Sequence, residues 1–286
     1  MELTESDFLY LGHCPWDETD EYDKFYIDAF GGEVVRCRHC GAIYARKRLN
    51  ESGLGKFWKN YSSRLHTSDI SALEKRRKMY EIDYEFIHGF ISNGEVLDIG
   101  CGEGNFLDVF ARNGYGTSGV EYGSEAASIS KKKHRLWEGV LPQIKIDDKF
   151  DLIIFRGVLQ YVVDPKAYLK KAIDLLNPNG YVYITSQPNG NSLCANLFRD
   201  KFTMPVNGVE LIAFNEKMLT KYFMDKGCRK AGETYFYEGT PYADVENDII
   251  TVAKAIELKR KNQIIDFKSP AFYGNMMTLV YQKCTC

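Results

Sequence analysis

Three glycines at alternating positions, Gly100, Gly102 and Gly104, mark the stretch of this sequence with the most specific chemistry. They follow the apolar run 95–99 and precede a stretch with helical spacing, so the pattern predicts a strand, a tight loop and the start of a helix. Glycine lets the backbone bend sharply and lets a ligand approach the N-terminus of the helix, because no Cβ stands in the way. We therefore predict a ligand-binding loop here.

Two acidic residues indicate which ligand this loop would accept. Asp98 stands two residues before the first glycine, where its carboxylate would repel a pyrophosphate and attract an amine. The G-x-G-x-G spacing also differs from the G-x-G-x-x-G of dinucleotide sites. Glu121 ends the next predicted strand, where an acidic residue accepts hydrogen bonds from a ribose diol in nucleotide-binding folds. The pattern indicates a nucleoside that carries a cationic group.

A second group of residues with the chemistry of a binding site lies near the N-terminus. Cys37 and Cys40 form a C-x-x-C pair, a spacing that tetrahedral zinc accepts, which is typical of half a zinc ribbon. The other half would be a second C-x-x-C pair, but here Cys14 is followed by Asp17 at the expected position. The three cysteines would supply three zinc ligands.

The fourth ligand is left open between His13 and Asp17, with His39, inside the C-x-x-C pair, as a less favoured candidate. The alternative is a ribbon that has lost its metal and folds through its own contacts. Because residues 17–23 are rich in acids, a nucleic-acid phosphate would be a poor partner for this module.

The elements that position these residues follow from the spacing of apolar residues. The first 50 residues hold short strand-like pieces at 33–36 and 42–45, which are too few to bury a core without a staple. From 57 to 90 the spacing is helical. Between 95 and 187, strands alternate with helices and the strands are almost continuously apolar. This alternation predicts a parallel sheet covered on both faces, a doubly wound α/β domain.

The last hundred residues begin with a loop-rich stretch, 188–214, which is too long for a simple connection and is a candidate lid over the site. The pattern after it predicts a helix over 215–226, a strand over 234–237, a helix over 245–261 and a final strand over 276–282.

Four stretches of the sequence together resemble the class I S-adenosylmethionine-dependent methyltransferases, in the order and spacing of that family. They are VLDIGCGEGNF at 96–106, GVEYG at 119–123, FDLIIFRGVLQYVVDP at 150–165 and LLNPNGYVYITS at 175–186. The resemblance implies a Rossmann-like α/β fold with a seven-stranded sheet and an antiparallel last strand. We therefore expect a zinc-ribbon-like module at 1–50, a helical linker at 51–92 and a methyltransferase domain at 93–286 with the lid at 188–214.

The resemblance also implies roles for individual residues. Asp98 and the glycine loop would hold the methionine part of S-adenosylmethionine, Glu121 the ribose hydroxyls, and Tyr122 would flank the adenine. Segment 138–140 would border the adenine, and segment 156–158 would line the floor near the sulfonium. The cofactor-binding residues expected in this way are Asp98, Gly100, Cys101, Gly102, Gly104, Glu121, Tyr122, Gly139, Val140, Arg156, Gly157 and Val158.

The acceptor is indicated by the domain layout. A ribbon followed by a linker and a methyltransferase resembles an architecture of sugar and natural-product methyltransferases, in which the ribbon is an accessory, substrate-facing module. Residues 269–276 resemble a stretch found in methyltransferases of polysaccharide and sugar-nucleotide gene clusters. We therefore expect a small-molecule acceptor, a sugar or sugar nucleotide of surface-polysaccharide biosynthesis, and leave open whether oxygen, nitrogen or carbon is methylated.

A general base is not evident. Methyl transfer from a sulfonium draws most of its rate from alignment, but a hydroxyl acceptor would be helped by a base. All five histidines lie at or before His134, and relatives commonly show histidine where this chain has Tyr161 and Glu210. These two residues are our candidates for catalytic handling of the acceptor. The alternatives are an aromatic side chain packed under the cofactor and an exposed loop acid.

Composition excludes several other classes of protein. With 44% hydrophobic and 27% charged residues among 286, the chain is not intrinsically disordered. A net charge of −2 disfavours RNA or DNA as a partner. No apolar run approaches the roughly 20 residues that span a bilayer, and the cysteines do not form a dense disulfide pattern. We expect a cytoplasmic protein that does not enter membranes.

Three other functions fit parts of the pattern. The acceptor could be a different small metabolite or an RNA. A nicotinamide-dependent oxidoreductase uses a similar sheet, but Asp98 and the glycine spacing disfavour it. A non-catalytic adaptor would keep the cofactor fold as a relic and use the ribbon to dock a partner.

Overall fold

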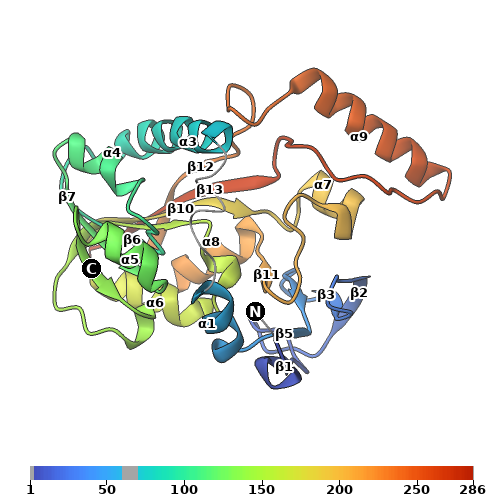
Figure 1. The fold of residues 1–286 in the computed structure, drawn as a ribbon, viewed down its shortest axis with the longest axis horizontal. Helices are drawn as coiled ribbons and strands as arrows, with labels where there is room; N and C mark the ends of the chain where they lie inside the picture. Colours follow the sequence, from blue (N-terminus) through green and yellow to red (C-terminus); the bar gives the residue numbers. More distant parts are fainter. Residues whose placement is uncertain (1–2, 60–69, 286) are drawn as a thin grey trace.

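A seven-stranded sheet forms the centre of the molecule (Figure 1). The computed structural model describes residues 3–59 and 70–285. The strands lie in the order β12-β13-β10-β9-β6-β7-β8; β13 is antiparallel to both neighbours, and the strands from β10 to β8 are parallel. This confirms the predicted α/β fold with an antiparallel last strand. The strands are β6 (Glu95–Ile99), β7 (Gly116–Glu121), β8 (Arg135–Glu138), β9 (Phe150–Arg156), β10 (Leu176–Pro188), β12 (Cys228–Thr234) and β13 (Met276–Lys283).

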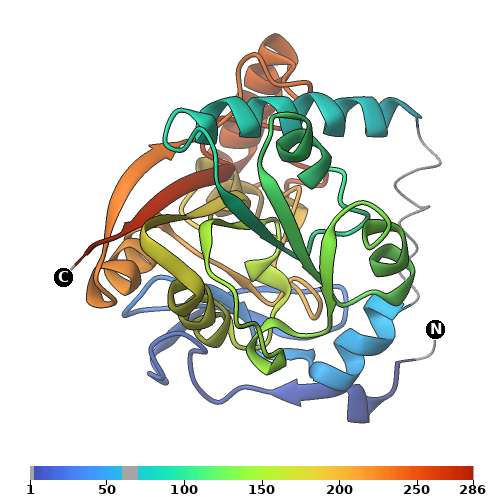
Figure 2. The same ribbon diagram turned by 90° about the vertical axis from the view of Figure 1, so that its left-hand side faces the viewer.

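Helices cover both faces of this sheet, with α3 and α4 on one side and α6 and α8 on the other (Figures 1 and 2). The α-helices are α1 (Glu51–Lys59), α3 (Ile70–His88), α4 (Leu107–Arg112), α5 (Ser124–Ser130), α6 (Pro165–Leu175), α7 (Leu193–Phe198), α8 (Glu216–Asp225) and α9 (Val245–Arg260). Short 3-10 helices are η1 (Glu5–Asp7), η2 (Leu141–Gln143), η3 (Leu159–Tyr161) and η4 (Arg199–Lys201). Within the described residues, none of the helices combines the length and the apolar character that crossing a membrane requires.

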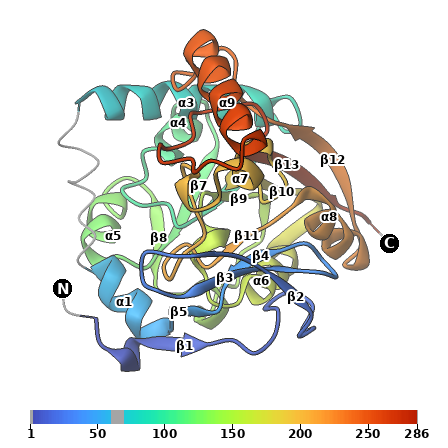
Figure 3. The same cartoon turned by 90° about the vertical axis from the view of Figure 1, so that its right-hand side faces the viewer.

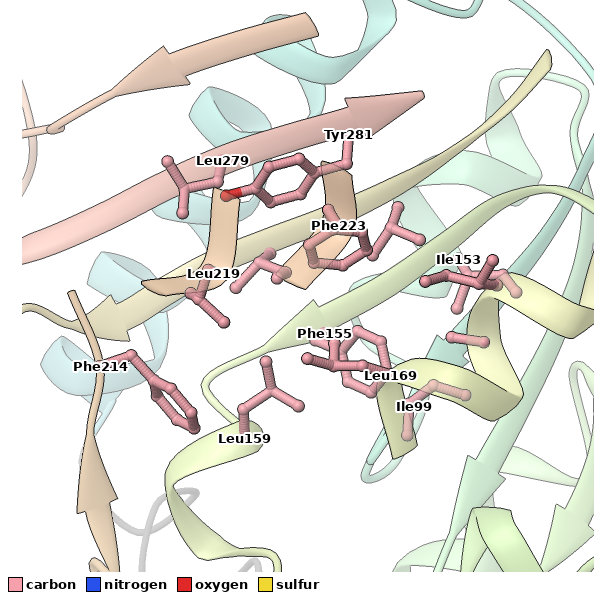
Figure 4. Close-up of a cluster of buried hydrophobic side chains, with 14 of the residues drawn as sticks. Ile99, Ile153, Phe155, Leu159, Leu169, Phe214, Leu219, Phe223, Leu279 and Tyr281 are labelled. Atoms are coloured by element: carbon pink, nitrogen blue, oxygen red, sulfur yellow. The ribbon is translucent and has the colours of Figure 1, made fainter. Parts of the chain in front are cut away.

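The core follows from the alternation of side chains along each strand. In β9, Leu152 and Ile154 pack with α3 and α4, whereas Ile153 and Phe155 pack with α6 and α8. Figure 4 shows the second cluster, where Ile153 and Phe155 lie among residues of α6, α8 and β13. All four side chains are fully buried. A strand that is apolar on both faces therefore holds the sheet between two helical layers, as its sequence predicts.

The N-terminal module joins the rest of the protein through a shared sheet. Its strands are β1 (Phe8–Tyr10), β2 (Tyr22–Ile27), β3 (Glu33–Cys37), β4 (Ile43–Ala45) and β5 (Lys47–Leu49). β1 pairs with β5, and β2, β3 and β4 form a second sheet whose fourth strand is β11 (Ile212–Ala213). β11 lies antiparallel beside β4, as Figure 3 shows, and comes from the end of the stretch 188–214. The module is thus a layer of the fold and shares its core.

The predicted elements agree with the structure in most of the sheet, but one strand is wrong. We predicted a strand over 234–237, whereas β12 covers Cys228–Thr234. β12 is an edge strand, and edge strands carry polar and charged side chains where the sequence pattern expects apolar ones. The Asn-Pro-Asn-Gly sequence at 177–180 is typical of a turn, but it lies inside β10, where the pairing with β9 shifts register. The helix predicted over 57–90 corresponds to the end of α1 and to α3, and 60–69 lie outside the described residues.

The stretch 188–214, predicted as a lid, carries structure of its own. It contains α7, η4 and β11, and Thr203 and Met204 are its residues on the central cavity described below. Backbone hydrogen bonds join it to the N-terminal module, from Ala45 to Leu211 and from Leu49 to Gly208. Movement of this stretch as a lid stays a prediction.

Candidate functional site

A cavity of about 1090 Å³ opens at the carboxyl ends of the parallel strands. Loops after β6, β7, β8 and β9 line it, together with the end of β10, α1, α3 and residues 236–242 and 271–276. This is the edge where doubly wound sheets bind ligands, and the volume is at the upper end of small-molecule sites, which span roughly 300–1,000 Å³. The predicted cofactor-binding residues on this cavity are Asp98, Gly100, Cys101, Gly102, Glu121, Tyr122, Gly139, Val140, Arg156, Gly157 and Val158.

The glycine loop needs glycine for two different reasons. Gly100, Gly102 and Gly104 all have positive φ, at 71°, 57° and 80°. A Cβ on Gly100 would lie 2.7 Å from a methyl group of Val158, and one on Gly104 would lie 2.6 Å from the ring of His134. Gly104 is absent from the cavity lining. Gly100 therefore lets the loop approach Val158 across the cavity, and Gly104 lets the loop pack against His134.

Asp98 is a buried carboxyl group with one oxygen that lacks a hydrogen bond within the described residues. It is 3% exposed, and its Oδ1 atom has no hydrogen-bond partner within the described residues. Burial raises the pKa of Asp98 to about 8; Glu121 adds to this effect and Arg156 opposes it. Burying a polar group without a partner costs stability, so the arrangement fits a ligand that brings a cation to this carboxylate.

Glu121 is fixed by the backbone of the glycine loop. Its two carboxylate oxygens accept hydrogen bonds from the N–H groups of Gly102, at 2.8 Å, and Gly123, at 2.7 Å. Burial raises its pKa, and these backbone donors oppose the rise. A carboxylate has about four lone-pair sites, so it can still accept bonds from a diol in the cavity. The neighbouring Tyr122 is 45% exposed and its hydroxyl lies close to Gly55 of α1, where a Cβ would be 2.6 Å away.

Arg156 is held by a partner that sequence reasoning missed. Its Nε donates to Asp83 Oδ2 at 2.8 Å, and its guanidinium carbon lies 4.6 Å from the ring centroid of Tyr80. Asp83 is fully buried in α3 and also accepts a hydrogen bond from Thr185 at 2.7 Å. An acid three residues after Tyr80, on the apolar face of the predicted helix, was the signal in the sequence. Asp83 thus orients Arg156 in the cavity beside Asp98.

Three segments outside the loops of the parallel strands also line the cavity, and we call this part of its lining the outer chamber. The lining residues from its three segments are uncharged and mostly aromatic or small and polar: Thr203, Met204, Phe236, Tyr237, Thr240, Tyr242, Ala271, Phe272, Asn275 and Met276. Flat apolar surface with a few polar groups is typical of small-molecule sites. The volume and the two chemically different parts suit two ligands bound side by side.

The two candidate catalytic residues meet in the fold. The hydroxyl of Tyr161 donates to Glu210 Oε1 at 3.2 Å, although the residues are 49 positions apart. Tyr161 lines the cavity, whereas Glu210 stands behind it and also accepts a hydrogen bond from Asn207. Burial and the neighbouring Glu210 carboxylate raise the pKa of the Tyr161 phenol. The pair is an oriented phenol with a carboxylate behind it.

Four residues of the N-terminal module converge as expected for a metal site. The ligand atoms of Cys14, Asp17, Cys37 and Cys40 all lie within 4.8 Å of one another. The sulfurs of Cys14 and Cys40 are 3.7 Å apart, and tetrahedral zinc with bonds of roughly 2.3 Å places sulfurs about 3.8 Å apart. The backbone N–H groups of His39 and Cys40 both point at Cys37 Sγ, at 3.3 Å. The donor set fits zinc.

The fourth position of this group is occupied by Asp17. His13 is exposed and lies outside the group. His39 also lies outside it, but its Nδ1 atom is 2.9 Å from Asp17 Oδ2. A histidine that holds a ligating carboxylate in this way is a usual neighbour of metal ligands.

Comparison with protein families gives a match over the α/β part of the chain. A family model described as "Methyltransferase domain" matches residues 73–234. Among curated proteins, the ubiquinone biosynthesis O-methyltransferase of Aeromonas salmonicida is 29% identical over 108 residues, which are 34% of this chain and 45% of that protein. The enzyme of the same name from Escherichia coli O7:K1 is 28% identical over 115 residues, 36% of this chain and 48% of that protein. The chain spans less than half the length of these relatives.

Solved structures share the fold at low identity. A methyltransferase of Thermotoga maritima gives a TM-score of 0.55 at 16% identity, covering 80% of this chain and 99% of that one. The magnesium protoporphyrin IX methyltransferase of Synechocystis, solved with S-adenosylhomocysteine, gives 0.54 at 12% identity, covering 82% and 100%. Both likenesses reach well beyond the segment that the curated sequences match.

Proposed function

This chain belongs to the methyltransferase-domain family, and from that premise we propose that it transfers a methyl group from S-adenosylmethionine to a hydroxyl of a small, sugar-like acceptor. The observation that carries the proposal is the buried Asp98 carboxyl group, whose Oδ1 atom has no hydrogen-bond partner within the described residues, beside a glycine loop with positive φ angles. A carboxylate in that place suits a ligand with an ammonium group. It does not suit the pyrophosphate of a dinucleotide.

Several residues of this chain would hold the donor. Asp98 would accept hydrogen bonds from its ammonium group, and Arg156, oriented by Asp83, suits its carboxylate. Glu121 would accept bonds from the ribose hydroxyls, and Tyr122 would flank the adenine. When bound, the sulfonium supplies an already activated methyl group, so the protein's task is alignment of the two ligands.

The acceptor hydroxyl would be handled by Tyr161 and Glu210. In our proposal the acceptor passes its proton to the Tyr161 oxygen while the Tyr161 proton moves to Glu210 Oε1, and the acceptor oxygen takes the methyl group. The hydrogen bond between the two side chains already points in this direction. This pair would replace a histidine base.

A structural zinc ion is part of the proposal. Cys14, Cys37, Cys40 and Asp17 would hold it, and their separations agree with a tetrahedral site. The ion would cross-link the two small sheets of the N-terminal module, which bury too little surface to be stable alone. It would also fix the turn between β3 and β4.

The sugar-like class of acceptor is supported by the uncharged lining of the outer chamber, with aromatic surface and polar edges. The link to surface-polysaccharide biosynthesis rests on the sequence resemblance and stays a prediction. The curated relatives carry names from ubiquinone biosynthesis, so a phenolic acceptor belongs in the same assay as the competing outcome.

The test has two steps. Isothermal titration with S-adenosylhomocysteine is expected to show binding, whereas NAD is expected to give no heat. Transfer of radiolabelled methyl groups is then measured with UDP-glucose, UDP-galactose, GDP-mannose and dTDP-glucose, and with catechol as the phenolic comparison. Absence of heat with S-adenosylhomocysteine would refute the donor assignment, and transfer to catechol alone would refute the sugar class.

A further inference from the structure

Gln160 is a buried amide on the cavity whose polar atoms lack partners. It is 1% exposed, it lines the cavity, and neither Nε2 nor Oε1 completes a hydrogen bond within the described residues. Its backbone is fixed, because its carbonyl accepts a hydrogen bond from the N–H of Leu211 at 2.7 Å. A buried amide whose nitrogen and oxygen both lack hydrogen bonds lowers the stability of the folded protein. Such a cost is expected where the amide binds a ligand.

The surroundings of Gln160 place it beside the Gly157 part of the predicted donor site. Its Nε2 lies 3.8 Å from the point where a Cβ on Gly157 would stand, and the Ser186 carbonyl lies 3.6 Å from the same point. A side-chain contact with the Gln160 amide lowers the pKa of the Tyr161 phenol, against the larger effect of burial, although this contact does not complete a hydrogen bond. Gln160 is therefore beside the phenol that would meet the reacting hydroxyl.

Two further features of the cavity lining point to a ligand. Ser186 lines the cavity with a φ of 51°, a left-handed conformation that is rare outside glycine and that gathers at functional sites. Asn275 is 3% exposed and also lines the cavity; its Nδ2 donates to the Pro270 carbonyl, but its Oδ1 has no partner within the described residues. Two amides of the cavity lining thus have oxygens without a donor within the described residues.

We propose that Gln160 binds the acceptor and selects acceptors with two neighbouring uncharged hydroxyls. One of these two hydroxyls is either the one that is methylated or a direct neighbour of the methylated hydroxyl. This rests on the proposed function and narrows its substrate class to vicinal diols. An amide needs one group that donates to Oε1 and one that accepts from Nε2, and a vicinal diol offers both. A carboxylate or phosphate offers acceptors alone and would leave Oε1 unpaired. The free oxygen of Asn275 takes a further hydroxyl.

A first test needs no acceptor. Gln160→Met keeps the length of the side chain and removes its polar atoms, so the ligand-free protein is expected to keep or raise its Tm. Gln187→Met is the matched control, since Gln187 is equally buried and unpartnered but is absent from the cavity lining. A fall in Tm with Gln160→Met alone would show that the amide is structural and would overturn the proposal.

The second test uses the sugar nucleotides named above and their deoxy analogues that lack the hydroxyl next to the methylated one. Gln160→Met is expected to raise the KM for the diol by about ten-fold, the loss of one good hydrogen bond, while the Kd for S-adenosylhomocysteine stays within two-fold. The deoxy analogue should have a similarly high KM with wild type and should respond little to the substitution. Gln187→Met should keep the wild-type KM.

The outcomes distinguish a failure of the role of Gln160 from a failure of the proposed function. Transfer to a sugar nucleotide with the same KM in wild type and Gln160→Met would overturn the role of Gln160 and leave the proposed function standing. Equal KM values for diol and deoxy acceptors would overturn the diol requirement. Transfer to none of the acceptors, catechol included, would overturn the proposed function and the diol selection with it. Transfer to catechol alone would overturn the sugar class; because catechol is itself a 1,2-diol, an unchanged KM for catechol in Gln160→Met would then overturn the role of Gln160.

Discussion

Replacing Asp98 with asparagine should stabilise the ligand-free protein while abolishing donor binding. The pKa of Asp98 is raised to about 8 in the fold, from about 3.9 in an unfolded chain. Between these values the folded protein holds a proton that the unfolded chain releases, so the free energy of unfolding falls as pH rises. pH 7 lies about three units above the pKa of Asp98 in the unfolded chain. Keeping this carboxyl group protonated in the folded protein at pH 7 therefore lowers the free energy of unfolding by about 4 kcal/mol.

The Asp98→Asn substitution would remove this cost, but the new amide would itself bury polar atoms without partners, at about 1–3 kcal/mol. We therefore expect a net gain of about 1–3 kcal/mol at pH 7, which for a chain of this size raises Tm by several degrees, at about 2–4 °C per kcal/mol. The assay is urea unfolding at pH 5, 6, 7 and 8 for wild type, Asp98→Asn and Asp147→Asn. Asp147 is an exposed acid in a surface ion pair, so its variant should follow wild type.

Donor affinity provides the second readout. Because the ionised carboxylate is the form that binds a cation, the affinity of wild type for S-adenosylhomocysteine should rise about ten-fold per pH unit between pH 6 and 8 and then level off. Asp98→Asn should bind too weakly to measure. A wild-type stability that does not decline from pH 5 to 8, or a destabilised Asp98→Asn, would show that the carboxylate is not an uncompensated buried charge.

Three shorter predictions concern the rest of the site. Tyr161→Phe and Glu210→Gln should each lower kcat about 100-fold, the low end of a general-base contribution, with unchanged S-adenosylhomocysteine affinity; a full kcat in either variant would exclude the relay. Gly104→Ala forces a Cβ against His134 at positive φ, so its Tm should fall, and a wild-type Tm would contradict the packing argument. Metal analysis should find one zinc per chain in wild type and none in Cys40→Ser, with a lower Tm; a metal-free wild type would refute the site.

The sequence predicts the part of the fold that repeats a simple pattern. β6 and β9 were found because strands buried on both faces are almost continuously apolar. The acidic residues at the strand ends, Asp98 and Glu121, were found because glycine spacing locates the loop that they flank. In these cases local sequence carries the information, and Asp98 and Glu121 line one cavity in the structure.

What the sequence did not predict depends on contacts between distant segments. Asp83 becomes a partner of Arg156 through the packing of α3 on the sheet, 73 positions away. The hydrogen bond between Tyr161 and Glu210 likewise needs the path of 188–214 over the N-terminal module. β12 was misplaced because an edge strand buries little and so lacks a periodic signal. Long-range pairing and edge position leave no local pattern to read.

The pairing of β4 with β11 has a consequence for how such chains can be shortened or recombined. The strand Ile212–Ala213 finds its neighbour in Tyr44 and Ile43, so removing the first fifty residues would strip a backbone edge and an apolar face from the enzyme that remains. The loop bearing Glu210 would lose its anchor in the same step. Recombination between related proteins would therefore have to transfer the N-terminal module and residues 206–214 together, although the two segments are far apart in the sequence.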